Sequence, residues 1–556
     1  MRYDTGVSTF YVENFGCRAT QADGAALERQ FEQRGLSRAA NPTDADLVVI
    51  NSCTVTSAAD QDARAAIRRI QRQNRDAKIV VTGCYAQRAP EEVAALEGVT
   101  CVIGNSHKHL LADIVLPKVA ITDRNWLEVD ARPPSQNFLP ATVLTENREL
   151  RTENRVFVSD IFAHTELLAA PVFDAPNQRT RPNLKVQDGC DNRCSFCVIP
   201  YVRGQSRSLP LAEIIAEVNT LVAAGYREVV VSGINLGRWG RDLGSQSTSS
   251  GQGTLLARPE RSEGNNGQRL IFEDVIRAIL AETQLEKLRI SSVEPMDWSD
   301  DLISLMAYSS RIAKHAHVPM QSGSDAVLRR MHRKYRPWHY REKIETIRAA
   351  MPTAAIGADV MVGFPGETDA EFESTRRLIE DLPFTYLHVF TYSARPGTPA
   401  ASMQNQVPIS VARERSRILR DLATEKKQAF MHSFIGQTIE AITLGSFPPM
   451  SSRAKPADSF ANRPGIVEGP AVSLADSFTE ALTDNYLKLR LKGRHDPNQW
   501  LSVQVQSVVE DSLAARLAGC LCPGGASDNS PARSAPGAEE EKSKSRRDGT
   551  SSRAHT

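Results

Sequence analysis

Six of the nine cysteines form two sets of three whose spacing suits the binding of iron. Three thiolates can hold an iron–sulfur cluster and leave its fourth iron with an open position. An open iron can bind a reactant, whereas a fully ligated cluster mainly carries electrons. Two reactive clusters are therefore the first hypothesis. The tight set is Cys190, Cys194 and Cys197, and the dispersed set is Cys17, Cys53 and Cys84.

The tight set has two alternative explanations, a zinc site and a partial ferredoxin motif. Its spacing lets one short loop wrap a cluster. Zinc prefers four ligands, and usually shows paired Cys-x-x-Cys elements or nearby histidines. No fourth cysteine or histidine lies close to Cys190–Cys197 in the sequence. The pattern therefore favours an iron–sulfur cluster over zinc.

The elements that would position the dispersed set come from the alternation of apolar runs and amphipathic segments over residues 8–116. Such alternation predicts a parallel sheet covered by helices. Cys17, Cys53 and Cys84 follow the first three predicted strands, at 10–12, 47–50 and 79–81. Ligands in open α/β sheets collect at the carboxyl ends of strands, so we expect the three thiols to meet there. The alternative is three unrelated buried cysteines, a common state for free thiols.

A second α/β region follows at residues 184–425. Its strand candidates are 184–187, 228–232, 287–291, 315–319, 356–362 and 385–391. Amphipathic helical patterns follow most of them, as at 211–224, 272–282 and 340–350. Six such units predict a partial (βα)6 barrel, whose active site would lie at the carboxyl ends of the strands. The tight cysteine set lies in the loop after the first of these strands.

The remaining segments are assigned by composition. Residues 431–513 alternate as short strands and predict a small antiparallel β-barrel, with an insertion at 446–478. Residues 117–182 are interpreted as a linker with an insertion, and 240–268 as a flexible insertion. The tail from 521 to 556 is rich in Gly, Ser, Pro and charge, and is expected to be disordered.

Composition limits the classes of function. A chain of 556 residues implies two to four domains. The net charge is +1, so a nucleic-acid site would have to be a local patch. No apolar stretch reaches the length of a membrane span, and the first residues carry no apolar signal region. We therefore expect a cytoplasmic protein without membrane contact, in which clustered cysteines bind metal and do not form disulfides.

The tight cysteine set at the first barrel strand resembles the radical S-adenosylmethionine (SAM) superfamily. The resemblance implies that the open iron binds the amino and carboxylate groups of SAM. In that superfamily, reductive cleavage of SAM yields a 5′-deoxyadenosyl radical that abstracts hydrogen from unactivated C–H bonds. Most of residues 8–513 further resemble the methylthiotransferase family. The matching motifs are residues 14–21, 51–56, 82–87, 291–295, 317–325 and 362–368.

The family resemblance implies a division of labour. Cys190, Cys194 and Cys197 would hold the SAM-binding 4Fe–4S cluster. Cys17, Cys53 and Cys84 would hold a second 4Fe–4S cluster whose open iron carries the sulfur. One SAM would give the methyl group and another the radical. The implied domains are the cluster domain (8–116), the radical SAM core (183–425) and a TRAM-like RNA-binding barrel (431–513).

Substrate choice separates the family branches. Residues 233–240 and 482–490 resemble the branch that modifies threonylcarbamoyladenosine beside the anticodon of tRNA. The alternatives are isopentenyladenosine in tRNA and an aspartate of a ribosomal protein. A rival of another class is an iron–sulfur RNA-binding redox sensor without catalysis. The resemblance also implies an external electron donor and a sulfur source, and leaves the oligomeric state open.

Further candidate residues are single side chains. Cations mixed with aromatics at 328–341 predict RNA contacts, although a solvated basic helix face explains them as well. Glu294 and Gln321 follow barrel strands and are expected to contact SAM or substrate. His315 and His317 are expected to pack or hydrogen-bond rather than bind metal. Cys101 is expected to be buried, and Cys520 and Cys522 to be incidental. The candidate RNA contacts are Arg333, Lys334, Arg336, Lys488 and Arg490.

Overall fold

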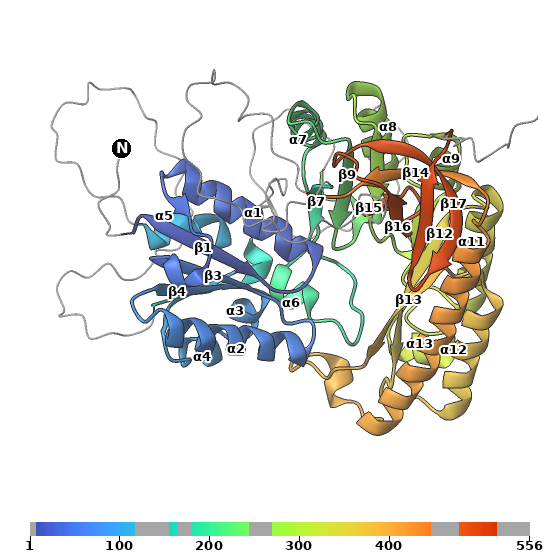
Figure 1. Cartoon of the computed structure of the whole chain (residues 1–556). Helices are drawn as coiled ribbons and strands as arrows, with labels where there is room; N and C mark the ends of the chain where they lie inside the picture. Colours follow the sequence, from blue (N-terminus) through green and yellow to red (C-terminus); the bar gives the residue numbers. More distant parts are fainter. Residues whose placement is uncertain (1–6, 117–154, 165–180, 244–268, 446–477, 520–556) are drawn as a thin grey trace, which may run out of the picture. The chain divides into compact units, whose positions relative to one another are not determined.

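The first sheet contains the four strands that the sequence predicts and two more. The computed structural model describes residues 7–116, 155–164, 181–243, 269–445 and 478–519. The strands of this sheet are parallel, in the order β2-β1-β3-β4-β5-β6 (Figure 1). The predicted members are β1 (Thr9–Asn14), β3 (Leu47–Ser52), β4 (Lys78–Gly83) and β5 (Val99–Gly104).

The two additional strands lie at the edges of the sheet. β2 (Ser37–Arg38) pairs with β1, and β6 (Arg155–Phe157) pairs with β5. β6 lies inside the segment 117–182 that the sequence analysis assigns to a linker. Both strands are too short to show a periodic pattern. Each satisfies backbone groups that an open sheet edge would leave unpaired.

Helices cover both faces of this sheet (Figure 1). Leu27 and Phe31 of α1 (Arg18–Gln33) pack on one face, where Phe10 lies 5.1 Å from Phe31 between ring centroids. Ile67 of α2 (Ser57–Gln73) packs on the other face with Tyr85. Because both faces are buried, the strands are continuous apolar runs. The shorter helices are α3 (Cys84–Arg88), α4 (Pro90–Ala94) and α5 (Leu111–Val115).

The partial barrel has the six predicted strands. They form a group β7-β9-β10 and a group β11-β12-β13, each parallel, with a parallel bridge Leu288↔Ile312 between them. A short antiparallel strand, β8 (Arg207–Ser208), closes the free edge of β7. The six strands are β7 (Asn183–Asp188), β9 (Glu228–Gly233), β10 (Lys287–Ile290), β11 (His315–His317), β12 (Ala355–Val362) and β13 (Tyr386–Thr391).

The helices of the partial barrel supply its outer layer. Their apolar faces join one core with the strands, including Ile214, Ile276, Ile347 and Leu419. The longer helices are α7 (Leu211–Ala223), α8 (Phe272–Glu282), α9 (Asp300–Tyr308), α11 (Pro337–Ala350), α12 (Asp369–Asp381) and α13 (Ile409–His432). The shorter ones are α6 (Ile199–Arg203) and α10 (Asp325–Arg330).

The C-terminal strands form a closed five-stranded barrel in the order β14-β15-β16-β18-β17. Leu489, Leu491, Val503 and Leu513 fill it, alternating with outward side chains. The β16–β18 pair is parallel, so the barrel is not wholly antiparallel as the sequence predicts. Its strands are β14 (Thr438–Thr443), β15 (Phe478–Thr483), β16 (Lys488–Lys492), β17 (Trp500–Val509) and β18 (Ser512–Leu517).

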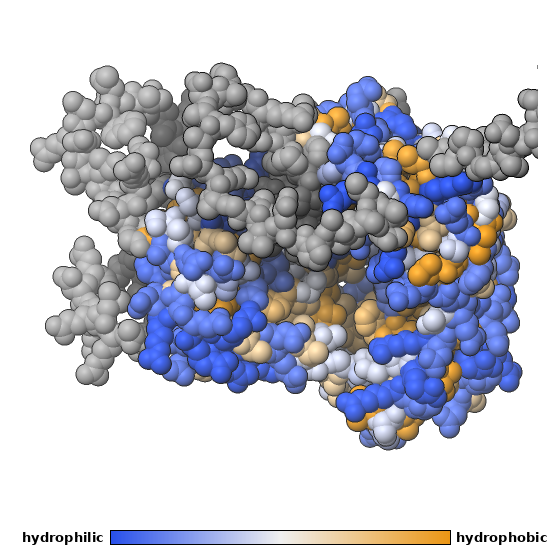
Figure 2. Space-filling view, viewed as in Figure 1, coloured by the Kyte–Doolittle hydropathy of each residue, from blue (hydrophilic) through white to orange (hydrophobic). Residues whose placement is uncertain are grey.

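Several sequence predictions fall outside the described residues. They are most of the linker, most of the two insertions, the tail, and Cys520 and Cys522. Among the described helices, none is both long and apolar enough to cross a membrane. Hydrophilic residues predominate on the face shown in Figure 2, with apolar residues in smaller groups. The described strands and helices all belong to the unit that ends at Ala518.

Candidate functional site

The dispersed cysteines come together at the carboxyl edge of the first sheet. Their strands β1, β3 and β4 are neighbours, and each cysteine lies just after its strand. Cys17 precedes α1, Cys53 follows β3 directly, and Cys84 opens α3. Burial, together with the nearby Cys84 and Cys17, raises the pKa of Cys53 to about 12. The convergence that the sequence predicts is therefore present.

A glycine lets the loop after β1 reach Cys53. Gly16 has φ of +97°, in the region that side chains disfavour. A Cβ on Gly16 would lie 2.5 Å from the Cβ of Cys53 and 2.7 Å from its Sγ. Only a glycine permits this approach, which brings Cys17 next to Cys53.

The tight cysteines lie in the loop after β7. Gly189 turns the chain with φ of +71°, and a Cβ there would lie 1.8 Å from the Gln205 carbonyl oxygen. The Sγ of Cys190 accepts hydrogen bonds from the Asn192 amide at 3.4 Å and from Asn235 Nδ2 at 3.6 Å. Burial raises the pKa of Cys190 to about 11 and that of Cys197 to about 12. Donors at the sulfurs favour the thiolate form that binds metal.

The spacing of both trios fits a cluster better than a single ion. A tetrahedral zinc ion with Zn–S bonds near 2.3 Å would hold its sulfurs about 3.8 Å apart. Among the described residues, a single group of three potential ligands has all its donor atoms within 4.8 Å of one another, and it contains no cysteine. Neither trio is therefore gathered around one point as a single zinc ion requires. Three thiolates can instead hold an iron–sulfur cluster.

The two trios are joined through a buried contact. Val198, which follows Cys197, packs against Cys84 together with Val202. Asn105 Nδ2 donates to the Sγ of Cys84 at 3.6 Å and to the carbonyl oxygen of Val202 at 2.7 Å. The loop of the tight trio and the start of α3 thus form one continuous packing unit.

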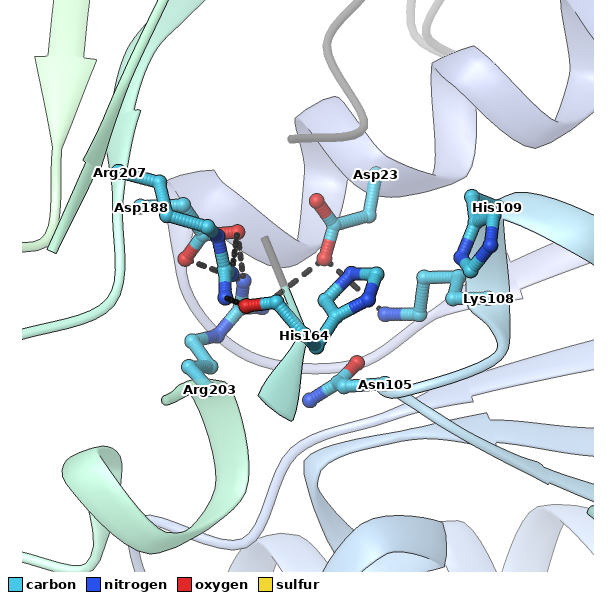
Figure 3. Close-up of a pocket in the computed structure, with 8 residues that line it drawn as sticks. All are labelled: Asp23, Asn105, Lys108, His109, His164, Asp188, Arg203 and Arg207. Atoms are coloured by element: carbon cyan, nitrogen blue, oxygen red, sulfur yellow. Dashed lines mark hydrogen bonds and ion pairs between the residues drawn. The ribbon is translucent and has the colours of Figure 1, made fainter. Parts of the chain in front are cut away.

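A buried group of charges lies beside this contact, and we call it the ion cluster (Figure 3). Asp23 Oδ2 lies 3.0 Å from Lys108 Nζ and 3.0 Å from Arg203 Nη2. Lys185 bridges Asp23 and Asp188, and Arg203 Nη1 lies 3.0 Å from Asp188 Oδ1. Burial raises the pKa of Asp23, but the three cations outweigh it and hold that pKa at about 2. The cluster ties α1 to β7 and α6.

Arg203 also supplies positive charge to the dispersed trio. Burial lowers its pKa, but Asp188, Cys84, Asp23 and Cys17 together hold that pKa well above its ordinary value. Its guanidinium is fully buried, so its field is weakly screened. A buried cation next to thiols favours their ionised, metal-binding form.

We expect Asp23→Asn to destabilise the protein strongly. Removing one partner of a buried charge network costs about 3–5 kcal/mol, because the other charges remain buried. The melting temperature should fall by roughly 10 °C in a thermal melt of the cluster-loaded protein. Glu414→Gln is the control, because Glu414 forms a fully exposed pair with Arg417 and should leave the melt unchanged. Equal melts for the two variants would show that the ion cluster adds nothing to stability.

One cavity joins the three structural parts. It has a volume of about 400 Å³ and lies at the carboxyl ends of β9, β10 and β11, beside the middle of β12 and the first half of β13. Cys17 and Arg18 form one wall, and Tyr486 of the C-terminal barrel forms another. Asn235, the hydrogen-bond donor to Cys190, directly follows the wall residue Ile234. The other wall residues are Ala19, Ser232, Gly233, Ser291, Ser292, His315, His317, Asp359, Tyr386 and His388.

Aromatic rings line one side of this cavity. The ring of Tyr486 lies 4.8 Å from that of His315 and 6.1 Å from that of Tyr386. Tyr486 has φ of +70°, a strained conformation that marks functional sites more often than chance. His315 Nε2 lies 2.6 Å from the hydroxyl of Tyr386 and so fixes the ring. This wall offers flat surfaces on which an unpaired base can stack.

Glu294 and Gln321, the two residues predicted to contact SAM or substrate, lie in different surroundings. Glu294 lies beside the tight trio, where Arg333 bonds both its carboxylate and, at 3.2 Å, the Sγ of Cys194. Gln321 follows β11 with φ of +63°, and its backbone pairs with β12. Gln321 is not among the residues that line the cavity. The position of Glu294 beside Cys194 remains consistent with a SAM contact.

The predicted RNA contacts fall into two groups. Arg333 is 7% exposed and bonded to Cys194, which argues against a direct phosphate contact. Lys334 is exposed beside it, and Arg336 pairs with Asp325 at 3.0 Å. Lys488 and Arg490 project from the same outer face of β16. They line a groove of about 1080 Å³ that shares Tyr386, His388 and Tyr486 with the cavity.

Sequence reasoning missed several residues of the site. Arg203 and Asp23 meet across 180 positions, so no local pattern signals them. Asp359 and His388 carried a usable signal, because each is a polar residue within an otherwise apolar strand. Arg18 and Tyr486 lie within the family-like segments 14–21 and 482–490, but no local pattern singles out their side chains.

Two family models match the chain. Residues 9–104, with the dispersed trio, match the model described as "Uncharacterized protein family UPF0004". Residues 184–379, with the tight trio, match the Radical SAM superfamily.

Curated relatives extend over most of the chain. "Threonylcarbamoyladenosine tRNA methylthiotransferase MtaB" of Bacillus subtilis is 32% identical over 88% of this chain and 92% of its own. The protein of that name from Rickettsia prowazekii is 34% identical, over 78% and 86%. "tRNA-2-methylthio-N(6)-dimethylallyladenosine synthase" of Novosphingobium aromaticivorans is 32% identical, over 78% and 86%.

The chain belongs to the radical SAM methylthiotransferase family. It is an enzyme of that family and uses SAM and 4Fe–4S clusters. The two trios are the sites whose donor chemistry and spacing fit those clusters. In this methylthiotransferase, Cys17 of the dispersed trio lines the cavity, and the tight trio is linked to it through the bond between Asn235 and Cys190.

Proposed function

We propose that this methylthiotransferase acts on tRNA and attaches a methylthio group to carbon 2 of threonylcarbamoyladenosine beside the anticodon. The observation that carries the proposal is the cavity whose walls combine Cys17 with residues of the partial barrel and Tyr486 of the C-terminal barrel. A volume of about 400 Å³ accommodates one modified base. Relatives named for this reaction are 32–34% identical to the chain.

The two trios have different roles in this proposal. Cys190, Cys194 and Cys197 would hold the SAM-binding cluster, and Cys17, Cys53 and Cys84 the sulfur-carrying one. When bound, these groups supply reductive SAM cleavage and the sulfur to be inserted. Arg333 would position Cys194 and Glu294, because it bonds both. Asn235 would orient Cys190 from the rim of the cavity.

The groove beside the cavity provides a path for RNA. Lys488 and Arg490 place cations along it, and Tyr386 and Tyr486 stand where it meets the cavity. Phosphate contacts position a nucleic acid, while stacking holds the unpaired base. The basic outer face of β16 favours RNA over a basic ribosomal protein. The enzyme would work in the cytoplasm with an external electron donor and a sulfur source.

We expect the double variant Lys488→Glu and Arg490→Glu to bind tRNA at least tenfold more weakly. The slope of log affinity against log salt should fall by about 2, because two phosphate contacts are lost. Filter binding across a salt series measures both quantities. Arg377→Glu with Arg417→Glu is the control, since both arginines are exposed and neither lines the groove. An equal effect of the two double variants would contradict an RNA path along the groove.

Mass spectrometry of tRNA nucleosides from a deletion strain tests the substrate. Loss of the methylthio group from threonylcarbamoyladenosine alone supports the proposal. Loss of the methylthio group from isopentenyladenosine instead would assign the enzyme to the branch that modifies that base. The Novosphingobium relative carries the name of that activity. Unchanged tRNA with an altered ribosomal aspartate would exclude tRNA. A reduced, cluster-loaded protein that cleaves no SAM would favour the redox-sensor alternative.

A further inference from the structure

Three potential metal ligands meet on the cavity wall. They come from neighbouring strands: His317 ends β11, Asp359 lies in β12 and His388 in β13. Asp359 and His388 are direct partners in the strand register. Asp359 Oδ1 lies 3.4 Å from His317 Nε2 and 3.2 Å from His388 Nδ1. All three donor atoms lie within 4.8 Å of one another.

These separations match the geometry of a bound ion. Zinc and similar ions bind histidine nitrogen and carboxylate oxygen at about 2.0–2.2 Å. Two donors of a tetrahedral ion at that range are about 3.3–3.5 Å apart, and neighbouring donors of an octahedral ion about 3 Å. The two separations from Asp359, 3.4 and 3.2 Å, lie in this range, and the two histidine nitrogens lie within 4.8 Å of each other. An ion at the centre of the group therefore requires only small side-chain movements.

The hydrogen bonding of His317 also points to a missing ligand. This residue is 6% exposed, and among the described residues its Nε2 makes no hydrogen bond beyond the 3.4 Å contact with Asp359. Its other nitrogen, Nδ1, lies 2.6 Å from Ser292 Oγ. Metal-binding histidines usually engage the second nitrogen in such a bond, which fixes the ring and frees the first nitrogen for the metal. The sequence favours packing or hydrogen bonding over metal binding for His317, so this arrangement departs from that expectation.

We propose that His317, Asp359 and His388 bind a divalent transition-metal ion, and that an open coordination position binds the carboxylate of the substrate base. Two histidines and one carboxylate suit zinc or ferrous iron, and three protein ligands leave at least one position open. The second half of this statement rests on the proposed substrate, because threonylcarbamoyladenosine carries a carboxylate.

Charge explains why the ion matters for recognition. Without an ion, Asp359 would present a negative charge to a negatively charged base. A divalent ion held by one carboxylate leaves a net positive charge in the cavity. Arg18, on the opposite wall, adds to it. An adenosine substituent without a carboxylate would gain nothing from this ion, so the site would also select between bases.

Zinc binding to the full-length, cluster-loaded protein tests the metal site without measuring activity. We expect one zinc per chain, and X-ray absorption at the zinc edge should show nitrogen and oxygen neighbours without sulfur. His388→Ala should weaken zinc binding at least tenfold at unchanged iron content. His432→Ala is the control, because His432 is exposed at the end of α13. Zinc bound only through sulfur, or equally by wild type and His388→Ala, would overturn the site and leave an ordinary His–Asp contact.

The ligand is tested separately with free nucleosides and the zinc-loaded protein. Calorimetry should show threonylcarbamoyladenosine binding at least tenfold more tightly than adenosine, and Asp359→Ala should remove the difference. Equal binding of both nucleosides by the zinc-loaded wild type would overturn carboxylate recognition. If nucleoside analysis of the deletion strain names another base, the proposed function fails while the zinc result still decides the metal site.

Discussion

Replacing Cys194 by Ala should abolish the production of 5′-deoxyadenosine from SAM. Cys194 supplies one of three thiols in a loop that holds no replacement, and Arg333 donates directly to its sulfur. An alanine removes both the ligand and the acceptor of that bond. Chromatography of reduced reaction mixtures should show a fall of at least a thousandfold. Iron content should drop from about eight to about four atoms per chain, because the dispersed trio is intact.

Cys101→Ala provides the matched control for this variant. Cys101 is also buried, but it lies within β5 and belongs to neither trio. Its replacement should leave SAM cleavage and iron content at wild-type values. Cleavage by the Cys194 variant at the rate of the Cys101 variant would refute the role assigned to the tight trio.

Replacing Cys53 by Ala should separate the two activities. Cys53 lies directly after β3, against Gly16, and Cys17 and Cys84 flank it. Its loss should empty the dispersed trio, while the loop after β7 keeps its own cysteines. We expect 5′-deoxyadenosine at a rate within a few-fold of wild type but no methylthiolated tRNA. The measurement is parallel quantification of both products in one reaction.

The contrast between these two variants is the critical comparison. Methylthiolated tRNA from the Cys53 variant would show that the dispersed trio does not deliver sulfur. Loss of SAM cleavage from the same variant would show that the trios depend on each other, as the contact between Cys84 and Val198 permits. Cys101→Ala again serves as the control, because it lies in the same sheet.

The sequence predicts the parts of the site that depend on local order. Cys17, Cys53 and Cys84 follow strands of one parallel sheet, and the carboxyl ends of such strands share an edge by geometry. The loop of Cys190 is also predictable from local order, because its three cysteines are close together in the chain. Both could be assigned before any contact was known, as could the six barrel strands.

The sequence does not predict the parts that depend on contacts between distant segments. Arg333 lies in a basic, aromatic stretch that indicates RNA binding, yet its side chain turns inward to Cys194. The pairing of Asp23 with Lys185 crosses 162 positions. β6 has three residues and no periodicity, so its strand conformation is explained only by pairing with the free edge of β5. These features follow from tertiary packing, which one sequence does not show.

The ion cluster has a consequence for engineering and for the exchange of modules between relatives. Asp23 belongs to the N-terminal sheet domain, whereas Lys185, Asp188 and Arg203 belong to the partial barrel. A chimera that swaps either module would leave buried charges without partners unless both modules keep all five charges of the ion cluster, Lys108 included. Separately expressed halves would expose the same charges to water. The two modules should therefore be exchanged as one unit, although the chain looks divisible.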